Sequence, residues 1–378
     1  MRTIQMVDLK SEYQRLKKEI DTAVIDVIES AAFINGKPVQ EFSKALAEYL
    51  NVKHVIPCAN GTDALQIAMM ALDLQPGDEV ITPSFTYIAT TEVVALLRLK
   101  PVFVEVNKQT FNIDIDSLRK AITSKTKAIV PVHLYGQSCD MEAIMQVANE
   151  FNLPVIEDNA QSIGGDYYFK DGTSKKTGTI GTIGTTSFYP AKNLGAYGDG
   201  GALFTNDDAL AHKLTMIANH GQSKRYYHDV VGCNSRLDTI QAAILNIRLQ
   251  HLDENINARI KVADFYDAAF KDHAVIKAPF RANNNKHVFH QYTLILDSDK
   301  AGLRDGLSAH LTEKKVPNMI YYPVPGHKQK MFESFGGLEY DLSTTDWLTE
   351  RVISLPMHPE LDEEQLKFIT ENVLGYFN

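Results

Sequence analysis

The chain has 378 residues, 44% of them hydrophobic and 22% charged, and its 38 Lys and Arg against 47 Asp and Glu give a formal net charge of −9. This acidic balance argues against a nucleic-acid-binding protein, which usually presents a concentrated basic face to phosphates. Three cysteines without a Cys-x-x-Cys pair, and the absence of any apolar run of about 18 residues, predict a cytoplasmic protein with no disulfide framework, metal site or membrane span.

The first two thirds of the chain alternate between helical and strand patterns. Apolar residues at helical spacing predict helices over 8–31 and 38–51. Later runs predict strands at 54–58, 79–83, 101–106, 128–133, 154–157, 185–189 and 202–205, and helices from 62, from about 88 and near 140–151. This alternation predicts a wound α/β sheet with some parallel strands, which binds ligands at the carboxyl ends of its strands.

The last third has a different pattern. A long helical pattern begins at about residue 237 and has the length to join two domains. Beyond it the sequence predicts a strand within 287–296, a helix near 302–313, a Tyr-Tyr-Pro-Val-Pro turn at 321–325 and a closing helix near 361–374. We therefore predict a large domain over 1–249 and a small C-terminal domain over 250–378.

The most informative motif is Ser187-Phe-Tyr-Pro-Ala-Lys192-Asn-Leu-Gly-Ala-Tyr-Gly-Asp-Gly-Gly201. Its lysine follows an apolar run and precedes a glycine-dense turn, where the backbone can wrap closely around a ligand. A lone lysine is most often a solvated surface residue. The alternative is that the Lys192 amine forms a Schiff base with an aldehyde while Ser187 binds a phosphate.

A second motif is Leu153-Pro-Val-Ile-Glu-Asp158-Asn-Ala-Gln161. It predicts a buried strand that places Asp158 at the edge of the sheet where ligands bind. The aspartate is either a turn or helix-cap residue, or it holds a protonated pyridine nitrogen and keeps the ring an electron sink. Only the second hypothesis needs a lysine and a phosphate site elsewhere in the chain.

A phosphate site is available at Ala59-Asn60-Gly61-Thr62, which follows a strand and opens a helix. Its free backbone N–H groups and the Thr62 hydroxyl can bind an anion, although a plain helix N-cap has the same residues. A Walker motif is absent, and the glycines at 178, 181 and 184 do not form the dinucleotide fingerprint. Tyr87, in the turn at 83–90, is either core filler or a residue that lies against a pyridoxal ring.

Together these four turns resemble the DegT/DnrJ/EryC/StrS family of nucleotide-sugar aminotransferases, within the fold-type I pyridoxal 5′-phosphate enzymes, over essentially the whole chain. The family pattern of a Gly-Thr turn, a Glu-Asp-x-Ala-Gln strand end, a Ser-Phe-x-x-x-Lys strand and a Gly-Asp-Gly-Gly turn is complete. The resemblance implies an aspartate aminotransferase-like α/β fold. Such a fold has a large mixed, mostly parallel sheet flanked by helices and a small C-terminal α+β domain.

The resemblance also implies roles for the residues around the cofactor ring. Lys192 forms the covalent link to the aldehyde of pyridoxal 5′-phosphate and then shuttles protons between substrate and cofactor. Asp158 pairs with the pyridine nitrogen. Gln161, where other members have His, contacts the 3′ oxygen, and Tyr87 lies against the ring face.

For the cofactor phosphate, the resemblance implies a site shared between two subunits. Gly61, Thr62 and Ser187 bind the phosphate from one subunit, and the partner subunit's Asn234 reaches it from the other. A homodimer with two shared active sites follows as an expectation.

The substrate that the resemblance implies is a nucleotide-linked 3-keto sugar, which takes the amino group that L-glutamate gives up in leaving as 2-oxoglutarate. Segments 220–238, 321–325 and 354–359 look most like the subgroup that aminates carbon 3. Within that subgroup the chain most resembles enzymes whose acceptor is UDP-2-acetamido-2-deoxy-3-oxo-D-glucuronate, a precursor of O-antigen, lipopolysaccharide or other surface polysaccharide. The guanidinium of Arg236 would bind the sugar carboxylate bidentately, unless it forms a structural bridge to Asp238 or a neighbour.

Three alternatives stay open at this stage. Tyr321 and Tyr322 would contact the sugar, but the family enzyme has His-Tyr there, so a dTDP-3-oxo-6-deoxyhexose is an alternative acceptor. A sugar dehydratase of the same fold would replace Lys192, typically by histidine. A non-catalytic regulatory protein of this fold would have lost at least one cofactor residue, and none is missing.

Overall fold

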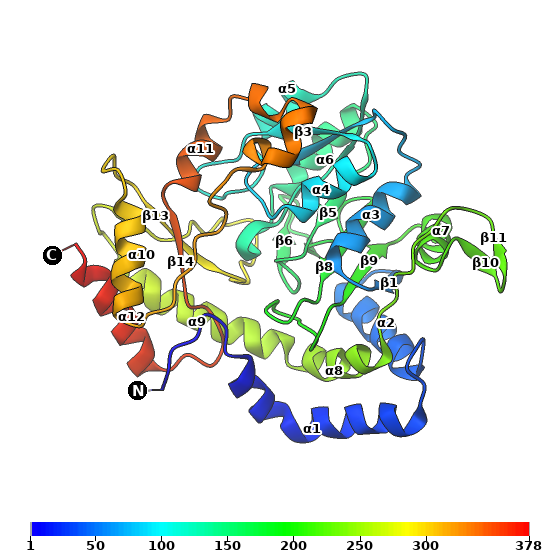
Figure 1. The fold of residues 1–378 in the computed structure, drawn as a ribbon, viewed down its shortest axis with the longest axis horizontal. Helices are drawn as coiled ribbons and strands as arrows, with labels where there is room; N and C mark the ends of the chain where they lie inside the picture. Colours follow the sequence, from blue (N-terminus) through cyan, green and yellow to red (C-terminus); the bar gives the residue numbers. More distant parts are fainter. Residues whose placement is uncertain (1, 378) are drawn as a thin grey trace.

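Two sheets joined by isolated bridges form the centre of the larger part of the molecule (Figure 1). The computed structural model describes residues 2–377. The strands are β1 (His54–Cys58), β2 (Glu79–Pro83), β3 (Lys100–Val104), β4 (Thr126–Ile129), β5 (Ile156–Asp158), β8 (Ile183–Ser187) and β9 (Gly201–Thr205). One sheet has the order β3-β2-β4 and the other β1-β9-β8-β5, and bridges from Ile129 to Val155 and from Val132 to Asp158 connect them.

The pairing confirms the predicted mixed, mostly parallel sheet. Strand β2 is parallel to β3 and β4, and β5 is parallel to β8, whereas β9 runs antiparallel to both β1 and β8. The strands therefore bring most of their carboxyl ends to one edge, which is where α/β sheets bind ligands.

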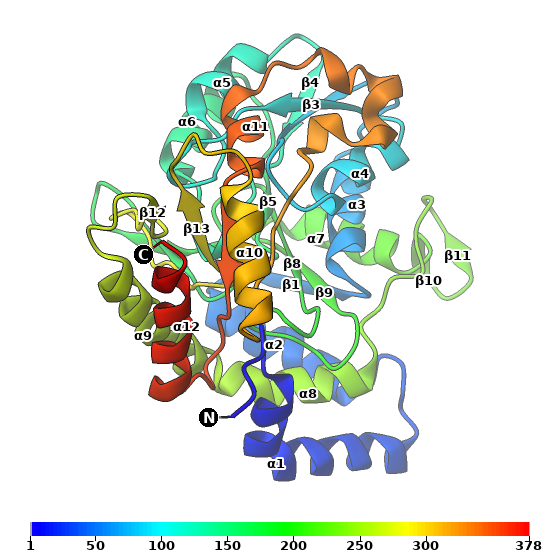
Figure 2. The same cartoon turned by 60° about the vertical axis from the view of Figure 1, so that its left-hand side comes forward.

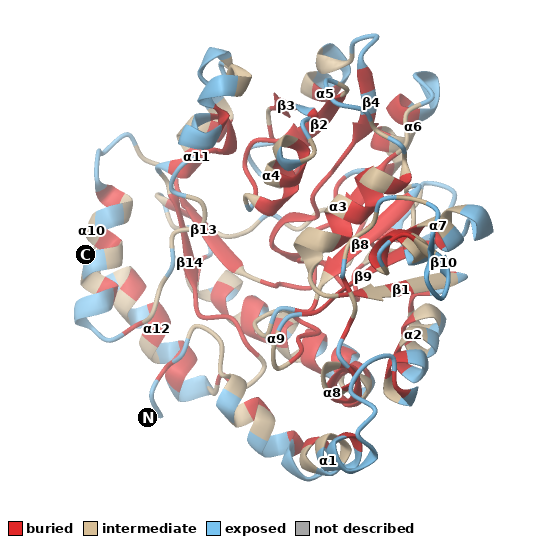
Figure 3. Cartoon of the chain, turned by 45° about the vertical axis from the view of Figure 1, so that its right-hand side comes forward, coloured by how far each residue is buried: buried red, intermediate tan, exposed pale blue. Residues whose placement is uncertain are grey.

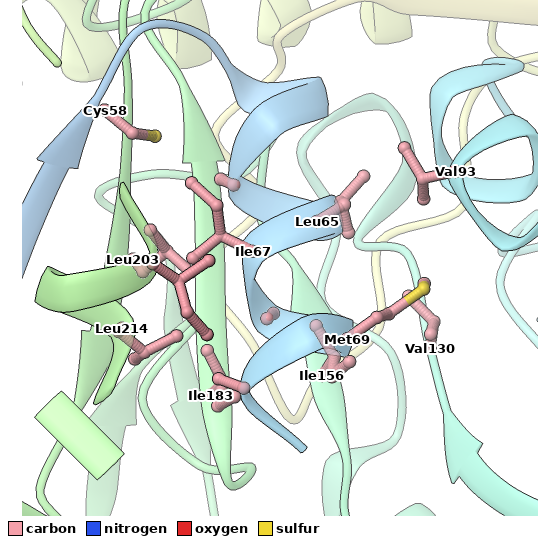
Figure 4. Packing of buried hydrophobic residues seen from close by; sticks show 14 of the residues in the cluster. Cys58, Leu65, Ile67, Met69, Val93, Val130, Ile156, Ile183, Leu203 and Leu214 are labelled. Atoms are coloured by element: carbon pink, nitrogen blue, oxygen red, sulfur yellow. The ribbon is translucent and has the colours of Figure 1, made fainter. Parts of the chain in front are cut away.

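Helices cover both faces of this sheet (Figures 1 and 2). They are α1 (Leu9–Ser30), α2 (Lys37–Leu50), α3 (Gly61–Ala71), α4 (Ala89–Leu96), α5 (Ile115–Ala121), α6 (Met141–Glu150), α7 (Asp208–Ala218) and α8 (Thr239–Gln250). Because neighbouring strand residues point to opposite faces, Leu203 packs with α3, α4 and α7 while Phe204 packs with α2 and α8. Figure 4 shows Ile67 and Met69 of α3 over the strands.

The C-terminal part has its own sheet and core. Strands β12 (Ile276–Lys277), β13 (Tyr292–Leu296) and β14 (Val352–Leu355) pair antiparallel, and α9 (Leu252–Phe270), α10 (Leu303–Glu313) and α12 (Glu363–Gly375) pack beside them. Ile4 is buried in the same core, so the N-terminal segment reaches into this part. The domain boundary between residues 249 and 250 stays a prediction.

Short elements complete the fold. They are β6 (Asp166–Tyr168), β7 (Ser174–Lys176), β10 (Gln222–Lys224), β11 (Tyr227–His228), α11 (Ser343–Thr349) and 3₁₀ turns at 134–136, 326–328, 330–335 and 337–339. The hairpin of β10 and β11 projects from the body (Figure 1). None of the helices within residues 2–377 is both long and apolar enough to cross a membrane.

One long helix was predicted from residue 237, and this prediction is wrong. The structure has α8 and α9 instead, separated at His251. The His251 N–H bonds the Arg248 carbonyl at 3.1 Å, three residues back, and so leaves the α-helical pattern. No glycine or proline marks this break in the sequence.

A buried ion pair attaches α1 to the rest of the molecule. Both carboxylate oxygens of Glu12 lie 2.7 Å from Nη2 of Arg248 in α8. The Arg248 Nη1 donates to the carbonyl of Gly195, in the glycine-rich turn after Lys192. One face of α1 packs on α8 while its outer face is exposed (Figure 3). The pair therefore connects α1, α8 and the glycine-rich turn that follows Lys192.

Candidate active site

A cavity of about 880 Å³ lies at the carboxyl ends of the sheet strands. It is lined by most of the residues that the sequence singles out, from both the N-terminal and the C-terminal part of the chain. These are Gly61, Thr62, Tyr87, Asp158, Gln161, Ser187, Lys192, Tyr321 and Tyr322. We take this cavity as the candidate active site.

Asp158 ends β5 at the wall of the cavity and is 5% exposed. Its Oδ2 accepts a hydrogen bond from the Thr90 hydroxyl at 2.7 Å, and its Oδ1 accepts one from the Ala160 N–H at 3.1 Å. The residue caps no helix within residues 2–377, so the helix-cap interpretation is wrong, whereas its bond to the Ala160 N–H two residues on is the turn contact that was the other interpretation. The carboxylate is instead held rigidly at the edge of the sheet, where it can face a ligand.

The neighbouring carboxylate anchors the same strand end from the other side. Glu157 is fully buried and accepts hydrogen bonds from the backbone N–H groups of Gly178, Ile180 and Gly181 at 2.9, 2.5 and 2.5 Å. Its Oε2 also lies 2.9 Å from Nε2 of His133. These bonds satisfy the buried charge and fix the backbone on which Asp158 stands.

Lys192 extends into the cavity from the turn after β8. Its Nζ makes no hydrogen bond to any of residues 2–377, and it is half-buried, so the interpretation as a solvated surface lysine is wrong. Burial lowers the pKa of the amine to about 8, and the nearby Asp158 carboxylate partly opposes this shift. A larger neutral fraction at neutral pH makes the amine a better nucleophile than an ordinary lysine.

We expect the pKa of Lys192 to be measurable by chemical labelling of the cofactor-free protein. Labelling by an amine-reactive reagent should rise with pH around a midpoint of about 8, well below the roughly 10.4 of surface lysines. In Asp158→Asn the midpoint should fall further, because the carboxylate that stabilises the ammonium is gone. Peptide mass spectrometry reads out each lysine separately, and a midpoint equal to that of the surface lysines would contradict the prediction.

A candidate anion-binding site lies where α3 begins. The side chain of Asn60 accepts from the Asp63 N–H at 2.8 Å and its carbonyl accepts from the Ala64 N–H at 3.1 Å, which leaves the N–H groups of Gly61 and Thr62 without a partner in residues 2–377. A Cβ at Gly61 would lie 2.7 Å from Cβ of Ser187, so glycine allows the end of β8 to approach the helix. Unpaired N–H groups and nearby hydroxyls suit a phosphate.

Aromatic residues and Gln161 form another wall. Gln161 accepts the Tyr135 N–H at 2.8 Å and donates from Nε2 to the Tyr322 hydroxyl at 2.9 Å, which leaves one amide N–H for a ligand. Tyr87 is 58% exposed, so it is not core filler. Its ring lies 6.4 Å from that of Tyr322 between centroids, and Tyr321 lines the cavity beside them.

Two predicted residues, Asn234 and Arg236, do not line the cavity of their own chain. Asn234 is exposed, and Arg236 donates to Oδ1 of Asn219 at 3.2 Å. Arg236 forms no ion pair within residues 2–377, so the bridge to Asp238 is wrong, although its bond to Asn219 is a contact with another neighbour. The cavity wall carries no arginine in that range, and Lys192 is its one lysine.

The structure adds residues that the sequence motifs did not single out. Thr90, which holds Asp158, lies in the first turn of α4 and has no sequence pattern of its own. His290 lines the cavity, and burial together with nearby Lys192 and Arg259 holds its pKa well below the usual value, so its ring is neutral. Met6 and Val7 close the cavity from the N-terminal segment. No group of His, Cys, Asp or Glu suited to a metal occurs within residues 2–377.

Residues 14–374 match the model of the DegT/DnrJ/EryC1/StrS aminotransferase family. The chain is 46% identical over 97% of its length to UDP-2-acetamido-2-deoxy-3-oxo-D-glucuronate aminotransferase of Pseudomonas aeruginosa, covering 98% of that protein. It is 44% identical over 99% of its length to a pleiotropic regulatory protein of Geobacillus stearothermophilus, again covering 98%.

Transaminases of dTDP-linked amino sugars also match, at 40% and 36% identity. Among solved structures, that of S. venezuelae DesV in complex with a ketimine intermediate superposes with a TM-score of 0.93 at 35% identity, covering 100% of this chain and 99% of that one. The predicted fold class is thereby confirmed.

Proposed function

The chain belongs to the DegT/DnrJ/EryC1/StrS aminotransferase family, and on that premise we propose that it moves the amino group of L-glutamate to carbon 3 of a nucleotide-linked keto sugar. The family acts with pyridoxal 5′-phosphate, which makes this chain a sugar aminotransferase with that cofactor. The observation that carries the proposal is a single cavity in which an unbonded lysine amine, a fixed carboxylate and a helix N-terminus meet.

The cavity residues match the chemical groups of pyridoxal 5′-phosphate. When bound, the cofactor supplies an electron sink for the carbon that gains or loses the amino group. The Lys192 amine would hold its aldehyde, and Asp158 its pyridine nitrogen. The N–H groups of Gly61 and Thr62, together with the Ser187 hydroxyl, would bind its phosphate.

The residues of the cavity wall would also orient the cofactor ring and transfer protons. Lys192, with a pKa of about 8, can both accept and return a proton close to neutral pH. Gln161, oriented by its bonds to Tyr135 and Tyr322, would donate its remaining N–H to the 3′ oxygen. Tyr87 would cover the ring face from the solvent side.

For the acceptor, we favour UDP-2-acetamido-2-deoxy-3-oxo-D-glucuronate. The 46% identical Pseudomonas aeruginosa relative is named for this sugar. Arg236 forms no ion pair within residues 2–377 and uses only its Nη1, in the bond to Asn219. A dTDP-3-oxo-6-deoxyhexose is the second candidate, supported by the dTDP-sugar transaminases among the relatives. The product would enter synthesis of O-antigen, lipopolysaccharide or another surface polysaccharide in the cytoplasm.

A non-catalytic regulatory protein is a third candidate, because one 44% identical relative bears a regulatory name. Against it, this chain retains Lys192, Asp158 and the helix N-terminus in one cavity. Incubation of the purified protein with L-[15N]glutamate and a panel of UDP- and dTDP-linked 3-oxo sugars, followed by mass spectrometry, separates all three. Nitrogen-15 in a UDP-glucuronate derivative supports the first candidate, label only in a 6-deoxy sugar supports the second, and no label in any sugar supports the third.

A change at Arg236 tests recognition of the sugar acid. We expect Arg236→Leu to lower kcat/KM for the UDP-glucuronate derivative by about 10- to 100-fold, because a hydrogen bond to a charged group contributes about 1.5–3 kcal/mol. The same variant should change turnover of an otherwise identical sugar without the carboxylate far less. An equal loss on both sugars would contradict a contact with the sugar acid.

The proposed homodimer shares its active sites. It is supported by a cavity whose only cation among the described residues is Lys192, although phosphate and carboxylate groups must bind there, and by Asn234 and Arg236, which lie outside it. Lys192→Ala and Asn234→Asp each remove one contribution to every site. If the two variants are unfolded and refolded together, mixed dimers should regain one intact site, and activity should return. A mixture as inactive as its parents would contradict sharing.

A further inference from the structure

A second, much smaller cavity borders the turn that carries Lys192. Its volume is about 10 Å³. Its walls come from residues 7–12, the turn at 190–193, α8, α9 and residues 358–359. It therefore lies where the N-terminal segment, the lysine turn and the C-terminal part of the chain meet; Figure 1 shows α8 and α9 end to end in this region.

Four residues on this wall are buried and carry polar atoms without a partner in residues 2–377. Their exposed fractions are 2% for His358, 3% for Arg248, 4% for Arg259 and 5% for Asn193. The unpartnered atoms are Nε of both arginines, Oδ1 of Asn193 and both ring nitrogens of His358, although one side of that ring faces the backbone of Gln5. Native proteins rarely leave buried polar atoms unpaired, and ordered water commonly bonds them.

The hydrogen bonds that these side chains already make determine which of their atoms have no partner. Arg248 uses its Nη groups on Glu12 and Gly195, and Arg259 donates from Nη1 to the Met357 carbonyl at 2.8 Å. Asn193 donates from Nδ2 to the carbonyl of Val288 at 3.0 Å, which sets its amide orientation. On the wall of the cavity, two arginine Nε–H donors and one amide oxygen acceptor therefore have no other partner in residues 2–377. Glu12, Lys192 and Asn255 lie on the same wall.

His358 adds a neutral imidazole to this wall. Burial, together with the neighbouring Arg259 charge, lowers the pKa of His358 to about 4, so near neutral pH the ring has one donor and one acceptor nitrogen. A water molecule can accept from both arginine Nε–H groups and donate to Asn193 and His358. A halide can only accept, so it would leave the Asn193 oxygen unpaired.

The volume of the cavity also indicates a single water molecule. A cavity of about 10–15 Å³ by this measure holds one water molecule. We propose that this cavity is a binding site for a single ordered water, which ties Asn193 in the lysine turn to Arg248, Arg259 and His358. The water links the large sheet part, through Asn193 and Arg248, to the C-terminal part, through Arg259 and His358. The proposal does not depend on the identity of the sugar.

A crystal structure of the holoenzyme with sodium bromide in the crystallisation solution tests the site directly. We expect a density peak about 2.7–3.2 Å from Nε of both arginines, without anomalous signal at the bromine edge. An anomalous peak there would show an anion site and overturn the proposal. A cavity without density at a resolution that shows other buried waters would overturn it as well.

Two substitutions at His358 test the site in solution. His358→Leu removes both ring nitrogens, whereas His358→Gln keeps a donor and an acceptor for the water. We expect the leucine variant to lower the thermal midpoint by about 2 °C or more and the glutamine variant to retain more than half of that difference. His212→Leu, at an exposed position of α7, is the matched control and should leave the midpoint unchanged. Equal losses in both His358 variants would count against a water-mediated contact.

Discussion

Lys192→Arg should abolish transamination, with a fall of about 10³-fold or more in turnover. Arginine keeps the positive charge, but it neither links covalently to an aldehyde nor gives up its proton near neutral pH. Lys192 is the only lysine on the cavity wall within residues 2–377, so no neighbour can replace it. Steady-state kinetics measure the loss of turnover. Mass spectrometry after borohydride reduction measures the loss of the covalent cofactor adduct.

The control for this variant is Lys175→Arg, at an exposed position, which should keep full activity and the covalent cofactor adduct. Retention of the adduct in Lys192→Arg would place the link at another lysine and refute the assignment. Retention of turnover without the adduct would refute a mechanism that needs the lysine amine.

Glu12→Gln should lower the free energy of unfolding by about 3–5 kcal/mol, because it leaves the Arg248 charge buried without its carboxylate. The pair is buried, and Glu12 binds the same guanidinium nitrogen through both oxygens. Urea unfolding followed by circular dichroism measures the change. The matched control is Glu41→Gln, which breaks the exposed pair with Lys37 and should leave the free energy of unfolding almost unchanged.

A double variant separates the loss of attraction from the buried, unpaired charge. Glu12→Leu with Arg248→Met removes both charges, and an apolar replacement of a buried pair is often close to neutral. It should therefore be more stable than Glu12→Gln alone. A Glu12→Gln protein as stable as Glu41→Gln would show that the pair contributes nothing to stability.

Local patterns predicted the sheet well, because a buried strand must be apolar over most of its length. The runs at 54–58 and 79–83 coincide with β1 and β2. The predicted strand at 128–133 is instead β4, which begins at Thr126 and ends at Ile129, since beyond Ile129 the chain makes one isolated bridge, from Val132 to Asp158. Hydrophobicity marks burial, and it does not report where hydrogen-bonded pairing stops.

Local sequence patterns could not predict the long-range contacts in the site. The bond from Thr90 to Asp158 joins residues 68 positions apart, and the contact of Gln161 with Tyr322 joins residues 161 apart. A threonine or glutamine has many local uses, so neither is recognisable by itself. The motifs at 61–62, 158 and 192 were recognisable because each follows a strand at the edge where ligands bind.

The N-terminal segment has a consequence for how the protein is made. Ile4 packs against the C-terminal helices, the Met6 carbonyl accepts the Met357 N–H at 3.2 Å, and Glu12 pairs with Arg248. During synthesis these early residues leave the ribosome hundreds of codons before their partners exist. The face of α1 that packs on α8 lacks this partner until residues 239–250 are made, and a nascent chain that stalls before residue 357 lacks part of the wall of the catalytic cavity. Assembly of the active site is therefore a late event in translation, although its lysine is made near the midpoint.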